Sequence, residues 1–209
     1  MRNGVDYLYW NNFRKHLTNQ VFFAIIIAKG EKMNYCSLHN HTEYSNLRGF
    51  LDAIVRPQEL VDRAYKLGYK GVAITDHDVV SGHLDMLEAA EKIKEKDPDF
   101  KAILGNEVYL VDGENIEECN KFYHFLLLAK DLEGHKQLRA LSSRAWERSF
   151  VKAGITRTPT FYSDIEEIVK PNKGHLIAST ACVGGFLSQL ILKKDGEELG
   201  KFIAWCVDC

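Results

Sequence analysis

The sequence predicts an α/β fold with a mainly parallel sheet, either open or closed into a barrel. Short apolar runs alternate with segments whose apolar residues recur at helical spacing, the pattern of repeated strand–helix units. Residue types that bind metal ions follow several of these runs, and in such folds the chemistry gathers at the carboxyl ends of the strands. The 209 residues, 45% hydrophobic and 27% charged, suit one sizeable soluble domain.

The first half of the chain contains three predicted strands and two predicted helices. The strands are expected at residues 35–38, 71–75 and 100–104, and the second is an apolar run of the kind found in buried parallel strands. Pro57 opens the first helix, because proline is tolerated at the first helical position. The second helix spans residues 84–96. Its apolar face is expected to consist of Leu84, Leu87, Ala90 and Ile93.

The second half of the chain continues the alternation. Strands are predicted at residues 122–129 and 175–179, because both are apolar runs of strand length. Helices are predicted at residues 132–148, 186–193 and 197–209.

The remaining segments of the second half are expected to be irregular. Residues 112–120 are acidic and polar and predict an exposed loop, whereas residues 151–161 lack periodicity and also predict a loop. Ser163 and Glu166 have the spacing of a capping box, which predicts the start of a short helix. Residues 171–174 predict a turn.

His39 and His41 stand at the end of the first predicted strand. On an extended strand, residues i and i+2 point to the same face, so both imidazoles project toward one point, as metal ligands do. An isolated His-x-His is more often a pair of ordinary histidines near a loop. The metal interpretation is favoured here because later strands also end in ligand-type residues.

His77 lies between Asp76 and Asp78 after the second predicted strand. We expect His77 to be a ligand, with Asp76 or Asp78 orienting it from behind. The alternative is that this segment simply caps the following helix.

Glu107, His124 and Cys182 are associated with three further predicted strands. Glu107 follows a predicted Gly-Asn turn and could bridge two metal ions, whereas His124 lies early in its strand, an offset attributed to strand stagger. His124 could instead be a core histidine, and Cys182 could be plain packing. Together, imidazole, carboxylate and thiolate favour Zn, Mn or Fe over Mg or Ca.

Other features carry less weight. His83, His135 and His175 are expected to be structural or on the surface, and Cys206 with Cys209 is expected to be a coincidental C-x-x-C. Five cysteines, an odd number, indicate a reducing compartment, and the net charge of -2 argues against a generally basic nucleic-acid coat. The apolar run at residues 21–28 is too short to span a bilayer, and no cleavage pattern for export follows it.

Residues 1–32 form a segment without recognisable chemistry, before a domain expected at residues 33–209. Lys29 to Lys32 require purine-rich codons, which resemble a bacterial ribosome-binding site in front of Met33. We therefore expect Met33 to be the true start and the first segment to be upstream read-through; a loosely packed extension is the alternative.

Four motifs resemble those of the PHP (polymerase and histidinol phosphatase) superfamily, at residues 38–45, 74–77, 105–108 and 123–130. The version is similar to the domain at the amino terminus of the alpha subunit of bacterial DNA polymerase III. Residues 124–146 and 174–185 carry that closer likeness and set the chain apart from a free-standing phosphatase.

The resemblance implies a distorted seven-stranded β/α barrel, here truncated at its carboxyl-terminal end, with a multinuclear metal site that hydrolyses phosphoesters. In polymerases this activity is implicated in 3′–5′ exonuclease proofreading. The implied catalytic residues are Glu107, His77 and Asp76. The implied metal ligands are His39, His41, Asp52, His77, Glu107, His124 and Cys182.

The resemblance also implies partners: the 3′ end of a DNA single strand, the remainder of the polymerase alpha subunit and other replisome subunits, in the cytoplasm and away from membranes. The family pattern needs a further Asp/Asn-x-His that this chain does not reach, so we expect the chain alone to be inactive and unable to polymerise. The alternatives are a non-catalytic, metal-stabilised scaffold module and a stand-alone PHP phosphatase.

Overall fold

The computed structural model describes residues 35–111 and 121–209. The chain divides into two units, Met1–Lys32 and Met33–Cys209, and the described residues belong to the second. The expectations for residues 1–32 and for the acidic loop at 112–120 fall outside the described ranges. Within those ranges, no helix is long and apolar enough to cross a membrane.

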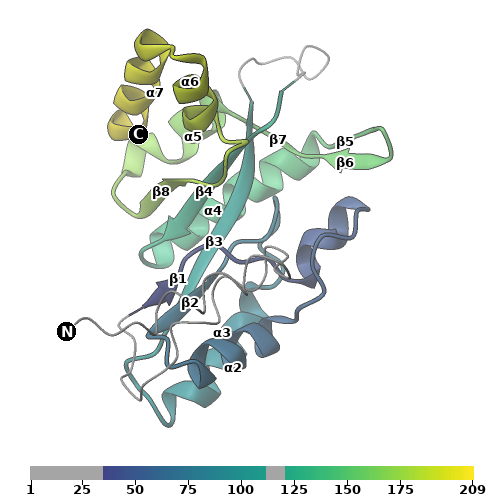
Figure 1. Ribbon diagram of the computed structural model, residues 1–209, viewed down its shortest axis with the longest axis vertical. Helices are drawn as coiled ribbons and strands as arrows, with labels where there is room; N and C mark the ends of the chain where they lie inside the picture. Colours follow the sequence, from purple (N-terminus) through teal and green to yellow (C-terminus); the bar gives the residue numbers. More distant parts are fainter. Residues whose placement is uncertain (1–34, 112–120) are drawn as a thin grey trace, which may run out of the picture. The chain divides into compact units, whose positions relative to one another are not determined.

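A mixed sheet of six strands forms the centre of the described unit (Figure 1). Five strands lie in the order β1 (Cys36–Ser37), β2 (Gly71–Ile74), β3 (Lys101–Val111), β4 (Tyr123–Ala129) and β8 (Leu176–Thr180), and β7 (Pro159–Phe161) pairs with β3. The β1–β2, β2–β3 and β3–β7 pairs are parallel, whereas β3–β4 and β4–β8 are antiparallel. The predicted α/β class is therefore confirmed, but the prediction of a mainly parallel sheet is wrong for β4.

Strand β3 is the long central strand, and three neighbours share its length. Residues 101–104 pair with β2, residues 105–110 pair with β4, and residues 109–111 pair with β7. The strand runs straight through Gly105 and Asn106, so the predicted Gly-Asn turn is wrong. A Cβ on Gly105 would lie 2.8 Å from the Leu127 carbonyl oxygen and 2.6 Å from the Leu128 side chain, which is why β4 can approach β3 this closely only beside a glycine.

Two helices cover one part of the sheet. Helix α2 (Pro57–Lys66) begins at Pro57 as predicted, and α3 (His83–Lys94) follows β2. Ala90 and Ile93 of the predicted apolar face are buried, but Leu84 is 65% exposed, so the prediction is wrong at that position. His83 and Met86 are buried in its stead, because His83 turns inward to hydrogen-bond the sheet. The core between these helices and β2 is formed by Val61, Ala64, Val72, Ile74, Met86, Ala89, Ile93 and Phe100.

The remaining helices lie where the sequence predicts them, to within a residue or two at each end. They are α4 (Leu132–Glu147), α5 (Tyr162–Ile168), α6 (Phe186–Lys193) and α7 (Gly196–Asp208). In the part of the chain that the structure describes, the 3-10 helices η1 (Glu43–Arg48) and η3 (Lys170–Asn172) lie in connecting segments. Aromatic contact joins α6 to α7, with the ring centroids of Phe186 and Phe202 5.0 Å apart.

The segment predicted as a loop at residues 151–161 contains three short strands. A hairpin of β5 (Phe150–Lys152) and β6 (Ile155–Arg157) turns at Ala153 and Gly154, which both have positive φ, and β7 follows. Helix periodicity and long apolar runs are both absent from strands of three residues, so the sequence could not reveal them. Helix α5 is capped by the Asp164 carboxylate, which accepts from the Phe161 N–H, and not by the predicted Ser163.

The close approach of β3 and β4 leads to a stability prediction. Gly105→Ala should lower the free energy of unfolding by about 1–3 kcal/mol, because the added methyl meets backbone as well as side chains. Gly200→Ala is the matched control: its Cβ would meet nothing within 4 Å, so helix propensity should leave stability equal or slightly higher. Chemical denaturation measures both, and equal stabilities for the two variants would contradict the packing at Gly105.

Candidate metal centre

One edge of the sheet collects the candidate ligands because of the direction in which each strand runs. His39 and His41 follow β1, and His77 follows β2 and pairs with Glu107 of β3. Strand β4 runs antiparallel to β3, so its beginning lies at this edge and His124 pairs with Tyr109. The offset of His124 therefore comes from strand direction and not from the predicted stagger.

Strand β8 completes this edge. It runs antiparallel to β4, with Thr180 beside Phe125, and therefore ends where β4 begins. Cys182 follows two residues later, and its Sγ lies 3.4 Å from His124 Nδ1. A cysteine far from the other candidates in sequence is thus brought to the same place.

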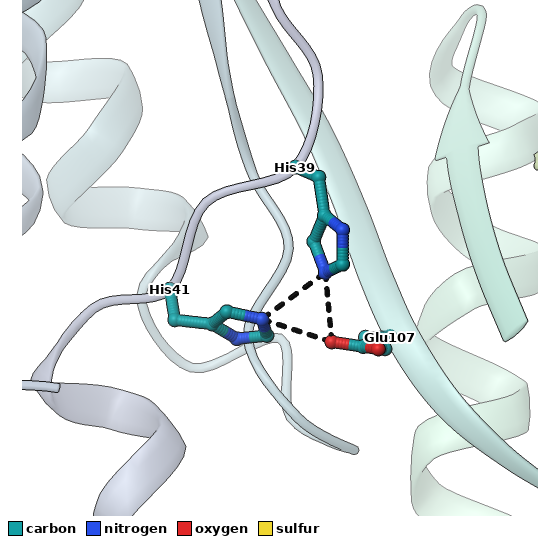
Figure 2. A group of neighbouring side chains, drawn as sticks. All are labelled: His39, His41 and Glu107. Carbon is teal, nitrogen blue, oxygen red and sulfur yellow. Dashed lines mark hydrogen bonds and ion pairs between the residues drawn. The ribbon is translucent and has the colours of Figure 1, made fainter. Parts of the chain in front are cut away.

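His39, His41 and Glu107 form a triangle of ligand atoms. Figure 2 shows both Nε2 atoms pointing at one oxygen of the Glu107 carboxylate, each 2.9 Å from Oε2. The two Nε2 atoms are 3.1 Å apart. Ligands of a tetrahedral metal with bonds of about 2.0–2.1 Å stand about 3.3 Å apart, so this triangle needs to open by only a few tenths of an ångström to hold an ion.

A second group shares the same carboxylate. His124 Nδ1 lies 2.8 Å from Glu107 Oε1, on the other oxygen from the first triangle, and His77 Nδ1 lies 3.5 Å from Oε2. His77, Glu107 and His124 each offer an atom within 4.8 Å of the others. Among the described residues, His77 Nδ1 is buried without a hydrogen-bond partner, which fits a nitrogen whose partner is an ion.

The carboxylate of the candidate metal centre is buried, whereas three of the histidines around it are partly exposed. The Glu107 side chain is 1% exposed, whereas His39, His41 and His124 are 24–30% exposed. Burial raises the pKa of Glu107, but contacts with His124, His39 and His41 outweigh it and hold that pKa well below its usual value. Burial lowers the pKa of His77 to about 3, so this imidazole is neutral, as a metal ligand must be.

Asp76 supports His41 from behind. The His41 Nδ1–H faces Ser45 Oγ at 3.2 Å, and the Ser45 hydroxyl donates to Asp76 Oδ1 at 2.8 Å. Because Nδ1 is used in this chain of hydrogen bonds, the lone pair of His41 is on Nε2, the atom that faces Glu107. Asp76 also accepts from the backbone and hydroxyl of Thr42 at 2.5 and 2.7 Å, which fixes the loop that carries both histidines.

Neither aspartate beside His77 orients its ring through a hydrogen bond found in the structure. The hydrogen bonds to the Asp76 carboxylate come from Thr42 and Ser45. Asp76, which was predicted to be catalytic, therefore contacts residues that support the candidate ligands. Asp78 is buried and accepts from the Tyr109 N–H at 3.2 Å, and burial raises the pKa of its carboxyl to about 7. The two residues flanking His77 therefore hold the backbone of the site.

Asp52 is the aspartate that contacts the His77 ring. Its Oδ2 lies 2.9 Å from His77 Nε2 and 3.3 Å from Arg48 Nη2. Arg48 also donates to the Tyr109 hydroxyl and lies over the Tyr109 ring, with 4.9 Å from Cζ to the ring centroid. Asp52, which was predicted to be a metal ligand, therefore lies against His77 with an arginine as its second partner.

Three residues of the site were not singled out from the sequence. Ser45 lies inside the first motif, four residues after His41, and this i+4 spacing was the available signal. Arg48 stands four residues before Asp52, and this i, i+4 spacing was the available signal. Nothing in the sequence around Tyr109 indicated its place beside His77, whose ring it stacks on with centroids 5.5 Å apart.

His83 and His135 lie outside the centre. His83 is buried, its Nε2–H donates to the Gly105 carbonyl at 2.9 Å, and its Nδ1 faces His135 Nε2 at 3.1 Å. These bonds tie α3 and α4 to β3. The expectation that these histidines are structural therefore agrees with their contacts. Burial lowers the pKa of His83 to about 4.

Comparison with known proteins identifies the sequence pattern. A family model described as the PHP domain matches residues 37–209. A DNA-directed DNA polymerase of Bacillus phage SPbeta is 44% identical over 193 residues, which cover 81% of this chain and 15% of that protein. The DNA polymerase III subunit alpha of Helicobacter pylori (strain ATCC 700392 / 26695) is 31% identical over 158 residues, covering 74% of this chain and 12% of that protein.

The match covers most of this chain but only a small part of each relative. The chain spans less than a sixth of the length of the two polymerases. Among solved structures, a protein from Bifidobacterium adolescentis aligns with 54% of this chain and 35% of its own, at 28% identity and a TM-score of 0.36.

The hydrogen-bond chain behind His41 predicts an effect on metal affinity. Ser45→Ala removes the link between His41 and Asp76 and should weaken Zn or Mn binding by about 10–100-fold, the usual cost of losing an outer partner of a ligand. Ser143→Ala, at an exposed position of α4, should leave affinity unchanged. Competitive titration with a chelating dye measures both. Equal affinities in the two variants would show that the Ser45 hydroxyl does not support His41.

Buried His83 predicts a pH dependence of stability. Its folded pKa of about 4 lies below the usual histidine pKa of 6.5, so the unfolded chain binds the proton more readily. Stability present above pH 6.5 is therefore lost as the pH falls toward 4, by about 3 kcal/mol at most. His83→Gln keeps a donor for Gly105 and should lose this part of the slope. Denaturation of both proteins at about pH 7 and about pH 4.5 measures it, and parallel slopes would contradict the prediction.

Proposed function

The chain belongs to the PHP domain family, and we propose that residues 33–209 act as the metal-dependent phosphoesterase domain of a DNA polymerase of the DNA polymerase III alpha type. One observation carries the proposal. A single buried carboxylate, Glu107, has imidazoles against both of its oxygens at an accessible edge of the sheet. This is the arrangement expected of a carboxylate that bridges two ions.

The donor set suits the proposed chemistry. When bound, divalent ions supply a nucleophile by lowering the pKa of water, and they stabilise the leaving oxygen of a phosphoester. His39 and His41 would hold one ion with Glu107 Oε2. His124 lies at the other oxygen, and Cys182 Sγ lies 3.4 Å from His124 Nδ1. Nitrogen and sulfur donors favour Zn, Mn or Fe, and the choice among them is part of the proposal.

The proposed roles of individual residues follow from their positions. Glu107 supplies the negative charge that balances the ions, and neutral His77 offers Nδ1 toward that carboxylate. Asp76 acts through Ser45 by fixing the nitrogen that His41 presents. His39, His41 and His124 are partly exposed, so a phosphodiester can approach the metal centre from their side.

The wider assignment rests on the relatives. Because the two relatives described above are DNA polymerases, we propose the 3′ end of a DNA single strand as substrate and proofreading as the role. We propose the rest of the polymerase and other replisome subunits as partners, in the cytoplasm. Closure of the six-stranded sheet into a distorted seven-stranded barrel belongs to the same proposal. So does the division into an amino-terminal extension at residues 1–32 and a PHP domain after it.

A second candidate is a metal-stabilised scaffold without turnover. The ion pair of Asp52 with Arg48 favours it, because a carboxylate expected to bind metal is already neutralised. A stand-alone phosphatase is less well supported, since polymerases are the relatives that the chain resembles.

Nuclease activity of the natural gene product separates these candidates. With Mn or Zn and a 5′-labelled single strand, we expect shortening from the 3′ end, and Glu107→Gln should slow it by at least about 100-fold, the scale of losing a group that organises catalysis. Glu88→Gln, at an exposed site on α3, is the matched control and should be fully active.

Two results would count against the nuclease. Cleavage that is equal in wild type and Glu107→Gln would assign the activity to a contaminant. Bound ions without any cleavage, together with a lower melting temperature in Glu107→Gln, would favour the scaffold.

A further inference from the structure

Arg48 is a cation built into the wall of the centre. It is the last residue of η1 and is 5% exposed, and it is the only buried lysine or arginine in the described ranges 35–111 and 121–209. A buried guanidinium is costly unless its charge is paired, and Arg48 cannot lose its proton. Its position therefore fixes a positive charge beside the candidate ligands.

The guanidinium is held from two sides. Nη1 donates to the Tyr109 hydroxyl, and Cζ lies 4.9 Å from the centre of the Tyr109 ring. Nη2 lies 3.3 Å from Asp52 Oδ2. A side chain with a hydrogen bond, a ring and a carboxylate around it is oriented, so its charge stays in place.

The same Asp52 oxygen contacts the centre. Asp52 Oδ2 lies 2.9 Å from His77 Nε2. The Glu107 carboxylate faces the other ring nitrogen, Nδ1, so Asp52 and Glu107 lie on opposite sides of the His77 ring. A carboxylate oxygen and an imidazole nitrogen are both donors that a divalent cation binds. With Arg48, the charge of Asp52 is already balanced, and a divalent ion there would meet a fixed like charge in a buried environment.

We propose that Arg48 occupies this end of the centre in place of a metal ion, so that the protein binds two divalent ions, both on Glu107, and none on Asp52 and His77 Nε2. The inference rests on the proposed metal function and adds the number of ions and the residue that sets it. Arg48 acts here as a positioning residue: it holds Asp52 against His77 and leaves His77 Nδ1 directed at Glu107.

Metal stoichiometry tests the inference without any assay of turnover. The natural gene product is equilibrated with Mn or with Zn, freed of loose ions by dialysis, and analysed by mass spectrometry of the elements. Wild type should hold two ions per chain. Arg48→Asp removes the cation and adds a carboxylate, so it should hold three. Arg48→Lys keeps the charge and should hold two.

Folding is controlled separately, because Arg48 is buried. Arg48→Gln is uncharged but can still hydrogen-bond Tyr109, and calorimetry should detect a third, weaker ion in it even where Arg48→Asp fails to fold. Arg139→Gln removes an exposed arginine of α4 and should keep two ions. Circular dichroism and thermal melting identify which variants are folded.

The outcomes distinguish this inference from the proposed function. Three ions in wild type, or two in folded Arg48→Gln and Arg48→Asp alike, would overturn the role of Arg48 and leave the metal centre intact. No bound ion in wild type would overturn the proposed function and the inference with it.

Discussion

The buried charge of Glu107 is the constraint on which the rest of the site depends. A carboxylate that is 1% exposed loses almost all of its hydration, which costs several kcal/mol unless partners replace water. Here the partners are imidazole nitrogens, with His124 at 2.8 Å and His39 and His41 at 2.9 Å. The carboxylate and the histidines are therefore interdependent, and metal ions bound among them would strengthen the same arrangement.

This constraint explains the position of β3. Glu107 can be reached from several directions only because its strand is central, with β2 on one side and β4 on the other. The glycine at position 105 lets β4 approach closely, which brings His124 into contact with Glu107 two residues further along. Packing of the core and assembly of the site thus rest on the same pair of strands.

Much of this could be predicted from the sequence. The segments that form β2, β4, α4 and α6 were identified from apolar runs and helical spacing, and the i, i+2 spacing of His39 and His41 predicted their convergence. Strand direction could not be predicted, because an apolar run reads the same in both directions. That is why β4 was taken as parallel and the position of His124 was explained by stagger.

The residues that support the ligands, such as Ser45 and Arg48, could not be predicted from local sequence patterns for a different reason. Ser45, which links His41 to Asp76, lies 31 residues from Asp76 in the sequence, and Arg48 lies 61 residues from the Tyr109 that it contacts. Which residues become partners depends on how the loops fold together in space. A short stretch of sequence shows that a charged residue is present, but not which residue it contacts. The pairing of Arg48 with Asp52, which in turn contacts His77, becomes visible only in the structure.

The central claim is that one carboxylate joins two ions, and anomalous X-ray scattering from crystals of the metal-loaded protein tests it most directly. Data collected at the absorption edge of Zn or Mn should show a peak beside each Glu107 oxygen, one within about 2.0–2.3 Å of His39 and His41 Nε2 and the other at a similar distance from His124. Peaks located only elsewhere, such as at Cys206 and Cys209, with none beside Glu107, would contradict it.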